Sequence, residues 1–295
     1  MPTIVIPAHN EERTLGRLLD RLLDGAAERE FDILVVCNGC TDGTAAVAAA
    51  RGPAVRVVET PVPSKHEALR LGDRHAEGFP RLYVDADVEL GAADVRALAA
   101  ALAGPGAVLA AAPERELPMG GCSWRVRAYY RVWQRLPAVR EGLFGRGVIA
   151  MSGEGHARIA ALPPLMADDL AASLAFAPAE RAVVDGAKVV VRPPRTWRDL
   201  IRRRIRAATS TAQLEEQQRE SADGPVPAGP AGAGAPPSAR TGLGDLRALL
   251  RADPTLLPAM LVFLSAALTA RRGARRAVRA RDFDTWLRDE SSRAD

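Results

Sequence analysis

Cysteines and long hydrophobic segments are both scarce in this chain of 295 residues. Its three cysteines, Cys37, Cys40 and Cys122, are too few and too uneven for a disulfide framework. The chain enters the apolar segment Thr3–Ile6 without the basic and long apolar regions of a signal peptide, so we expect a cytoplasmic protein. The uncharged segment 254–270 is shorter than the roughly 20 residues that span a bilayer. These absences argue against a secreted domain and against a protein with several membrane helices.

Lysine and net charge are also low. The 40 basic and 36 acidic residues leave a formal charge of only +4, which gives no indication of a nucleic-acid partner. Nearly all basic residues are arginines, so Lys65, one of two lysines, is harder to attribute to composition. Cys37 and Cys40 have the spacing of a metal or redox pair, but no second Cys/His pair accompanies them. We therefore interpret them as structural thiols.

The most informative motif is Asp85-Ala86-Asp87, which directly follows the apolar segment Arg81–Val84. Ligands of open α/β sheets bind at the carboxyl ends of parallel strands. In an extended segment the side chains of Asp85 and Asp87 point the same way and can converge on one hard cation. A cation held by one or two carboxylates usually completes its shell with substrate phosphates. Alone, the motif is a weak signal, because a solvated acidic turn explains it more often than a metal site does.

The first hundred residues alternate between strand and helix patterns, which predicts βαβ units and an α/β fold. Asn10 is expected to cap the first helix, with Glu11 and Glu12 in its first turn. The predicted strands are 4–6, 33–36, 55–58 and 81–84, and the predicted helices are 11–23, 44–51 and 65–78.

The remaining chain is less regular. We expect strands at 148–151 and 189–191 and helices at 124–136, near 168 and at 197–219. Residues 221–241 are rich in Pro, Gly and Ala and predict a flexible loop. The apolar segment 254–270 predicts a helix packed on the protein, with a helix in the membrane interface as the alternative. In the second case the following arginines, up to residue 281, would favour anionic lipid.

Together, the motifs of the first ninety residues resemble those of family 2 glycosyltransferases with the glycosyltransferase A fold. The resembling segments, in order, are Ile4–Glu12, Val35–Thr44, Ser64–Leu69 and Asp85–Asp87. The resemblance implies a Rossmann-like mixed sheet flanked by helices, with a helical C-terminal appendage. We expect a glycosyltransferase domain at 1–220, divided at 115 into a nucleotide-sugar half and an acceptor half. The loop 221–241 and a helical segment at 242–295 follow.

The resemblance also implies roles for individual residues. Asp85 would contact the ribose, and Asp87 would bind Mn²⁺ or Mg²⁺. The donor-binding residues would be Pro7, Ala8, Asn10, Glu11, Asn38, Asp42, Lys65, Asp85 and Arg206. Glu11 is equally well explained as an acidic residue in the first turn of a helix, and Asp42 as a capping residue. His156 is a further candidate metal ligand, although a lone histidine is more often structural.

The catalytic base is expected at an acidic pair. Asp169, with Asp168 as second choice, resembles the base of inverting family members, while a pair of helix N-cap acids is the alternative. Arg203 and Arg206 resemble the basic segment that follows the base, and Arg206 would hold the pyrophosphate. Processive synthases carry a Trp where this chain has Ala207, so we expect a single transfer.

The sequence therefore predicts a metal-dependent, inverting, non-processive glycosyltransferase that uses a UDP-, GDP- or dTDP-sugar and a hydroxyl acceptor. A role in cell-envelope or polysaccharide biosynthesis, with peripheral membrane contact through 254–281, fits this prediction. Alternatives are a catalytically silent nucleotide-binding protein, a membrane-recruited scaffold and a nucleotidyltransferase. The last is disfavoured because Pro7–Glu11 replaces its usual Gly-rich loop.

Overall fold

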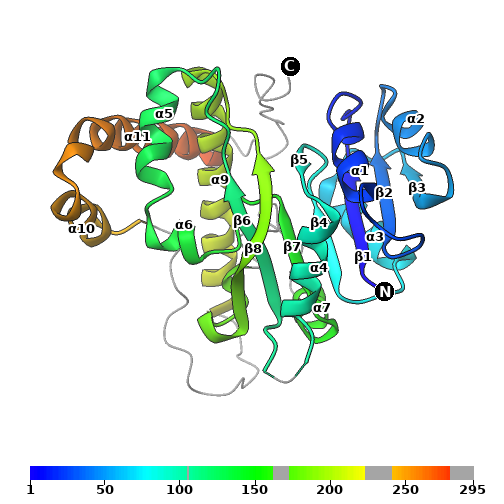
Figure 1. The fold of residues 1–295 in the computed structure, drawn as a ribbon. Helices are drawn as coiled ribbons and strands as arrows, with labels where there is room; N and C mark the ends of the chain where they lie inside the picture. The colour runs from blue at the N-terminus through cyan, green and yellow to red at the C-terminus, as the bar shows by residue number, and fades with distance from the viewer. Residues whose placement is uncertain (105, 162–172, 223–240, 280–295) are drawn as a thin grey trace. The chain divides into compact units, whose positions relative to one another are not determined.

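The computed structural model describes residues 1–295 except 105, 162–172, 223–240 and 280–295 (Figure 1). The chain forms two compact units. The first holds all the described strands with helices α1 to α4 and α7, and the second holds helices α5, α6, α9, α10 and α11. The glycine- and proline-rich residues 223–240 of the predicted loop lie outside the described residues.

A mixed sheet is the centre of the first unit, and its described strands follow the order β3-β2-β1-β4-β7-β6-β8-β5. The first four, all parallel to one another, confirm the predicted strands; they are β1 (Thr3–Ala8), β2 (Asp32–Asn38), β3 (Val55–Thr60) and β4 (Arg81–Val84). The others are β5 (Val88–Glu89), β6 (Ala110–Glu116), β7 (Val148–Met151) and β8 (Arg181–Val191). Strand β7 runs antiparallel to β4, so the sheet changes direction next to the Asp85 motif.

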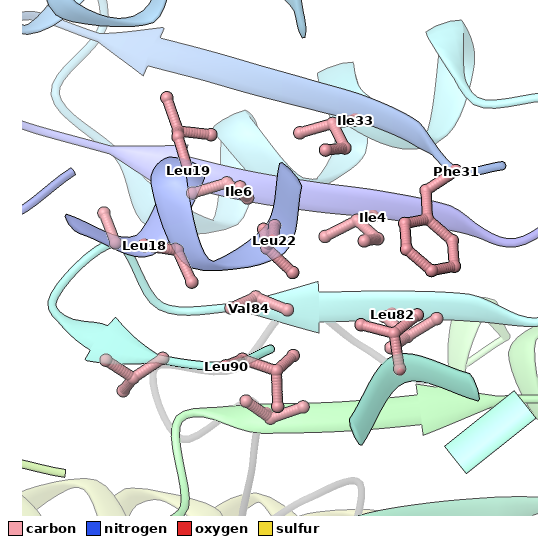
Figure 2. Close-up of a cluster of buried hydrophobic side chains, with 14 of the residues drawn as sticks. Ile4, Ile6, Leu18, Leu19, Leu22, Phe31, Ile33, Leu82, Val84 and Leu90 are labelled. Carbon is pink, nitrogen blue, oxygen red and sulfur yellow. The ribbon is translucent and has the colours of Figure 1, made fainter. Parts of the chain in front are cut away.

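Helices cover both faces of the sheet in the first unit. They are α1 (Leu15–Leu23), α2 (Thr44–Ala49), α3 (Lys65–His75), α4 (Ala92–Ala101) and α7 (Gly153–Ala160), with a short 3₁₀ turn at Gly52–Ala54. Alternate side chains of β1 point to opposite faces: Ile4 and Ile6 join the cluster beneath α1, and Val5 joins the cluster beneath α3. Figure 2 shows the first cluster, where Leu18, Leu19 and Leu22 of α1 meet the strand side chains.

Asn10 does not cap the first helix, so that prediction was wrong. Helix α1 begins at Leu15, with Thr14 at its N-cap position. Asn10 instead has a left-handed backbone (φ 53°), and its Oδ1 accepts a hydrogen bond of 2.7 Å from the Thr41 backbone N–H. The amide is thus engaged by a residue distant in sequence, which local helix signals could not reveal.

The second unit is helical in its described part. It comprises α5 (Trp124–Trp133), α6 (Pro137–Glu141), α9 (Trp197–Ala222), α10 (Leu243–Ala252) and α11 (Leu257–Arg279), with a 3₁₀ turn at Pro254–Leu256. Pro258 does not interrupt the predicted apolar helix but stands in its first turn, where proline is tolerated. By length and composition, Pro254–Ala277 is the one described segment that could cross a membrane, and a third of it is buried in the protein.

Helix α3 packs so closely on β1 that its Gly72 leaves no space for a side chain. A Cβ atom at this position would lie 2.4 Å from Val5 Cγ1. We expect Gly72→Ala to lower the free energy of unfolding by roughly 1–3 kcal/mol, because overpacking outweighs the helix propensity of alanine. Urea denaturation measures this change.

Gly16→Ala in α1 is the matched control. Its added Cβ would meet only the end of the Arg51 side chain, at 3.2 Å, and Val47 at 3.7 Å. Because that guanidinium can shift, we expect this variant to be as stable as the parent or more so. Equal stability of the two variants would contradict the predicted close contact between α3 and β1.

Candidate active site

The candidate site lies where parallel strands β1, β2 and β4 end at one edge of the sheet. Val5 pairs with Leu34 on one side and with Tyr83 on the other, so the three strands terminate together. The residues at these ends are polar: His9 follows β1, Asn38 ends β2 and Asp85 follows β4. This is the edge at which open α/β sheets bind ligands.

Lys65 and Asp85 form an ion pair at this edge. Lys65 is the first residue of α3, and its Nζ lies 2.7 Å from Asp85 Oδ1. Both side chains are about 40% exposed (41% and 39%), so solvent and ligands can reach them. The structure thus brings together two residues that are 20 positions apart in the sequence and were both predicted to contact the donor.

Asp85 and Asp87 lie in a turn rather than in an extended segment. The Val88 N–H donates to Asp85 O at 3.4 Å, which closes the turn over Ala86 and Asp87. The prediction that the two carboxylates point the same way from an extended segment was therefore wrong. Both carboxylates nevertheless remain partly exposed, because Ala86 and Val88 take the buried positions between and after them.

The oxygen donors of Asp85 and Asp87 fit a hard divalent cation such as Mn²⁺ or Mg²⁺. Within the described residues, no three His, Cys, Asp or Glu side chains are grouped in a way that could hold a metal ion. A pair of partly exposed carboxylates suits a cation that takes its remaining ligands from water and substrate phosphates. The residues present therefore fit the predicted metal.

His156 does not belong to this group. Its Nε2 lies 3.3 Å from Asp73 Oδ1, and its ring packs edge-on against Phe79 at 5.4 Å. Arg81, at the first position of β4, binds the same Asp73 oxygen at 3.1 Å, whereas Asp85 follows the last position of that strand. Four strand residues, about 13 Å, separate the two ends. We therefore remove His156 from the candidate metal ligands.

Gly147 supports Asp85 and was missed by sequence reasoning. The Asp85 N–H donates to Gly147 O at 2.8 Å. Gly147 has a left-handed backbone (φ 67°), and a Cβ there would lie 2.6 Å from Val88 Cγ1 and 3.2 Å from Asp85 Oδ2. Only glycine lets β7 approach the acidic turn this closely. The pair of glycines around Arg146, just before a strand pattern, was the available signal.

Asn38 is a structural residue of the edge, with only 1% of its surface exposed. With the amide in the orientation that satisfies both neighbours, its nitrogen donates to Ala8 O at 2.7 Å and its Oδ1 accepts from the Ser64 N–H at 3.2 Å. These bonds join the ends of β1 and β2 to the start of α3. Both polar atoms of the amide are therefore hydrogen-bonded within the protein.

The two cysteines of the Cys-x-x-Cys segment are free thiols. Burial, with smaller contributions from Cys40 and acidic neighbours, raises the pKa of Cys37 to about 12. Cys40 Sγ donates to Ala8 O at 3.3 Å. A buried, protonated thiol is unreactive, in agreement with the interpretation as structural thiols.

Glu11 and Asp42 are both held by hydrogen bonds within the protein. Glu11 is buried, and its Oε2 accepts from Thr14 Oγ1 at 2.7 Å. Asp42 accepts from the Thr44 N–H at 3.0 Å, from its hydroxyl, and from the Glu12 N–H at 3.3 Å. Burial opposes ionisation of Asp42, but these hydrogen bonds outweigh it and lower its pKa. Asp42 thus binds the first N–H of α2 from the position before the N-cap residue Gly43, which agrees with a capping role.

The predicted catalytic residues Asp168 and Asp169 lie outside the described residues. Arg206 lies on α9 in the second unit and is exposed. Pro7 and Ala8 are buried residues of β1. The candidate site residues that the structure places at this edge of the first unit are therefore Lys65, Asp85 and Asp87, with Asn38 and Gly147 beside them.

The chain belongs to glycosyl transferase family 2, whose family model matches residues 3–152. Its mixed open sheet flanked by helices is of the glycosyltransferase A type, as the resemblance implied. The protein is accordingly an enzyme that transfers glycosyl groups, and the predicted family, fold class and enzyme class are confirmed.

Individual relatives agree with this classification. Uncharacterized glycosyltransferases of Mycobacterium tuberculosis and Mycobacterium bovis are each 33% identical to this chain over 165 residues, which are 50% of this chain and 71% of each relative. A mannosyltransferase from Pyrobaculum calidifontis, solved in complex with GDP-Man and Mn²⁺, has a similar fold with a TM-score of 0.59. That match is 22% identical and covers 95% of this chain and 75% of the other.

The cluster around Asp73 makes stability depend on pH. Burial disfavours its charged form, but hydrogen bonds from His156 and Tyr83 and the charges of His156 and Arg81 outweigh burial and lower the pKa of Asp73. The stabilisation is complete above the ordinary carboxyl pKa of about 4 and is lost as the pH falls towards the lowered native value. We expect Asp73→Asn to be clearly less stable than the parent at pH 7 but nearly equal to it near pH 2, measured by urea denaturation.

Tyr83→Phe is the graded comparison, because it removes only the hydrogen bond of 2.7 Å to Asp73 Oδ1. Its loss of stability at pH 7 should be smaller than that of Asp73→Asn. A constant difference between Asp73→Asn and the parent from pH 7 to pH 2 would show that ionised Asp73 does not stabilise the fold.

Proposed function

We propose that this glycosyltransferase transfers a sugar from a nucleoside-diphosphate sugar to an acceptor hydroxyl, once per binding event and with inversion. The proposal rests on one observation above all: Lys65 and Asp85 meet beside Asp87 at the carboxyl edge of a family 2 fold. A cationic group and two accessible carboxylates supply the charges needed to hold a ribose, a pyrophosphate and its counter-cation. The related mannosyltransferase, whose complex contains GDP-Man and Mn²⁺, supports a donor of this class.

Each residue of the edge has a separate task in this proposal. Asp85 accepts hydrogen bonds from the donor ribose, and Lys65 exchanges its contact with Asp85 for one with a donor phosphate. Asp87, with Asp85 as second ligand, would hold Mn²⁺ or Mg²⁺. Such a cation, when bound, neutralises charge on the departing diphosphate. Arg206, by resemblance, adds positive charge to the same leaving group.

The acceptor hydroxyl needs a base, which we assign to Asp169 with Asp168 as second choice. A hydroxyl with a pKa near 15 is not ionised in advance, so the carboxylate takes the proton while the new C–O bond forms. Attack from the side opposite the departing diphosphate inverts the anomeric centre. Ala207, at the position where processive synthases have Trp, supports a single transfer.

Donor binding is tested by thermal unfolding of the purified protein with UDP-, GDP- and dTDP-sugars, each with and without Mn²⁺ or Mg²⁺. A ligand that binds only the native state raises the melting temperature, by the equivalent of about 2.7 kcal/mol at 100 times its Kd. We expect a cation-dependent rise with one nucleotide class. Asp87→Ala should abolish the dependence on the cation.

The second lysine provides a matched control for Lys65. Lys65→Ala should weaken nucleotide binding about tenfold or more, because a charge-assisted contact contributes roughly 1.5–3 kcal/mol. Lys188→Ala, on β8, should bind like the parent. Failure of the parent protein to respond to any nucleotide with either cation would contradict the proposal. Binding without any release of nucleoside diphosphate would instead identify a catalytically silent protein.

The base assignment is tested by slow hydrolysis of the donor, which needs no known acceptor. Asp169→Asn should reduce nucleoside diphosphate release about 100-fold or more, the usual contribution of general base catalysis, while its nucleotide-dependent melting shift persists. Asp168→Asn should retain most of the rate. Equal rates for Asp169→Asn and the parent would show that another group is the base. The anomeric configuration of freshly released sugar, followed by NMR, tests inversion.

A further inference from the structure

Helix α11 carries a row of exposed leucines on one face. Their exposed fractions are 51% for Leu257, 62% for Leu261, 36% for Leu264 and 54% for Leu268. Spacings of four, three and four residues place the row along a single line on the helix. Four leucines in one line form a contiguous apolar surface, which is a different situation from scattered exposed residues.

The opposite face of α11 packs against other helices of the second unit. Met260, Phe263 and Ala266 are buried, and the Phe263 ring stacks on Tyr129 of α5 at 5.2 Å. Gly273 lets the helix approach α9, because a Cβ there would lie 2.6 Å from Ile205. The helix is therefore held by one face while the leucine row faces away from its packing partners, so the row does not contribute to the core of this unit.

The hydroxyl groups beside the leucine row make their hydrogen bonds within the helix. Ser265 Oγ donates to Val262 O, and Thr269 Oγ1 donates to Ser265 O, both at 2.8 Å. Transfer of this surface into an apolar medium would leave neither hydroxyl proton without an acceptor. Polar groups satisfied in this way are what a lipid environment requires.

A basic group continues the same face. Arg271 and Arg272 follow Leu268 by three and four residues, and Arg275 and Arg276 lie one turn further. All four side chains are exposed, and none forms an ion pair with another residue that the structure describes. The sequence has no acidic residue between Asp253 and Asp282. An apolar row that ends in exposed positive charge matches the acyl chains and head groups of an anionic bilayer.

Helix α10, which precedes α11, has similar properties. None of its side chains is buried, and Leu243 is 72% exposed. Leu246, Leu249 and Leu250 are also partly exposed. A ten-residue helix with four leucines and no buried side chain obtains little stability from the protein itself.

We propose that α10 and α11 form a docking surface for anionic lipid membranes, with the leucines in the interface and the arginines at the head groups. A second copy of the same surface fits less well, because Asp245 of α10 is the one carboxylate that the helices α10 and α11 offer to those arginines. One face of α11 is occupied by α5 and α9, so the helix lies along the membrane surface and does not cross it. This proposal is independent of the donor and of the catalytic residues.

Flotation of the full-length protein with vesicles tests the proposal. Vesicles of phosphatidylcholine alone are compared with vesicles that contain about 30% phosphatidylglycerol, each at low and at high salt. We expect the protein to float with the anionic vesicles only, and less at high salt. Each arginine near an anionic surface contributes roughly fivefold in affinity.

Three variants separate the contributions. L261Q/L264Q/L268Q and R271Q/R272Q/R275Q/R276Q should each reduce flotation at least about tenfold. R70Q/R74Q, which removes exposed arginines of α3, should float like the parent. Circular dichroism and thermal melting establish that each variant is folded, and exposed Leu→Gln changes should leave both nearly unchanged.

Several outcomes would overturn the proposal. These are no flotation of the parent, equal flotation with neutral and anionic vesicles, and a folded leucine variant that floats like the parent. A concentration-dependent dimer that the leucine variant abolishes, without flotation of the parent, would assign the surface to a second copy of this chain. Nucleotide binding is measured in a separate experiment and does not involve this surface. Failure of the membrane proposal is therefore distinguishable from failure of the proposed function.

Discussion

The parallel pairing of β1 with β2 and β4 is the constraint on which the site depends. The register of these strands brings residues from four distant parts of the sequence to one edge, where Asn38 joins β1 to α3 and Lys65 joins α3 to Asp85. Close approach is possible only where side chains are missing. A Cβ on Gly39 would lie 2.8 Å from Pro63 Cβ. Glycine there has the same purpose as on the β7 side of Asp85, which is to let neighbouring loops meet without strain.

Two ion pairs at opposite ends of β4 differ in how far they are exposed to solvent. Lys65 and Asp85 are accessible, so water screens their attraction and a ligand can replace it at little cost. Asp73 and Arg81 meet at the other end of β4, where the arginine side chain is only 5% exposed. Removing Asp73 leaves the buried charge of Arg81 without its ionic partner. The same strand therefore carries an exchangeable ion pair at one end and a structural one at the other.

Helix α11 shows why an apolar sequence does not specify one environment. Its phenylalanine, methionine and alanine side chains meet α5 and α9, while its leucines remain exposed on the other side. Both sets are apolar, so periodicity alone predicts a helix buried all round or one lying in a membrane interface. The packing of the second unit shows that one face of α11 is buried in the protein, and it leaves the environment of the other face open. The exposed arginines that follow the leucines are the basis for proposing an anionic membrane at the other face.

The sequence by itself determined the strands β1 to β4, the helices between them and the family, because alternation, helical spacing and turn residues act over a few positions. It also placed Asp85 and Asp87 at the carboxyl edge of the sheet, because they follow a predicted parallel strand, and the family resemblance added Lys65 to them. Only the tertiary structure decided that Asn10 binds Thr41, that Asn38 is buried and that His156 pairs with Asp73. Each of these contacts joins residues about 30 or more positions apart, and a side chain takes such a partner only when the whole sheet has brought the two segments together.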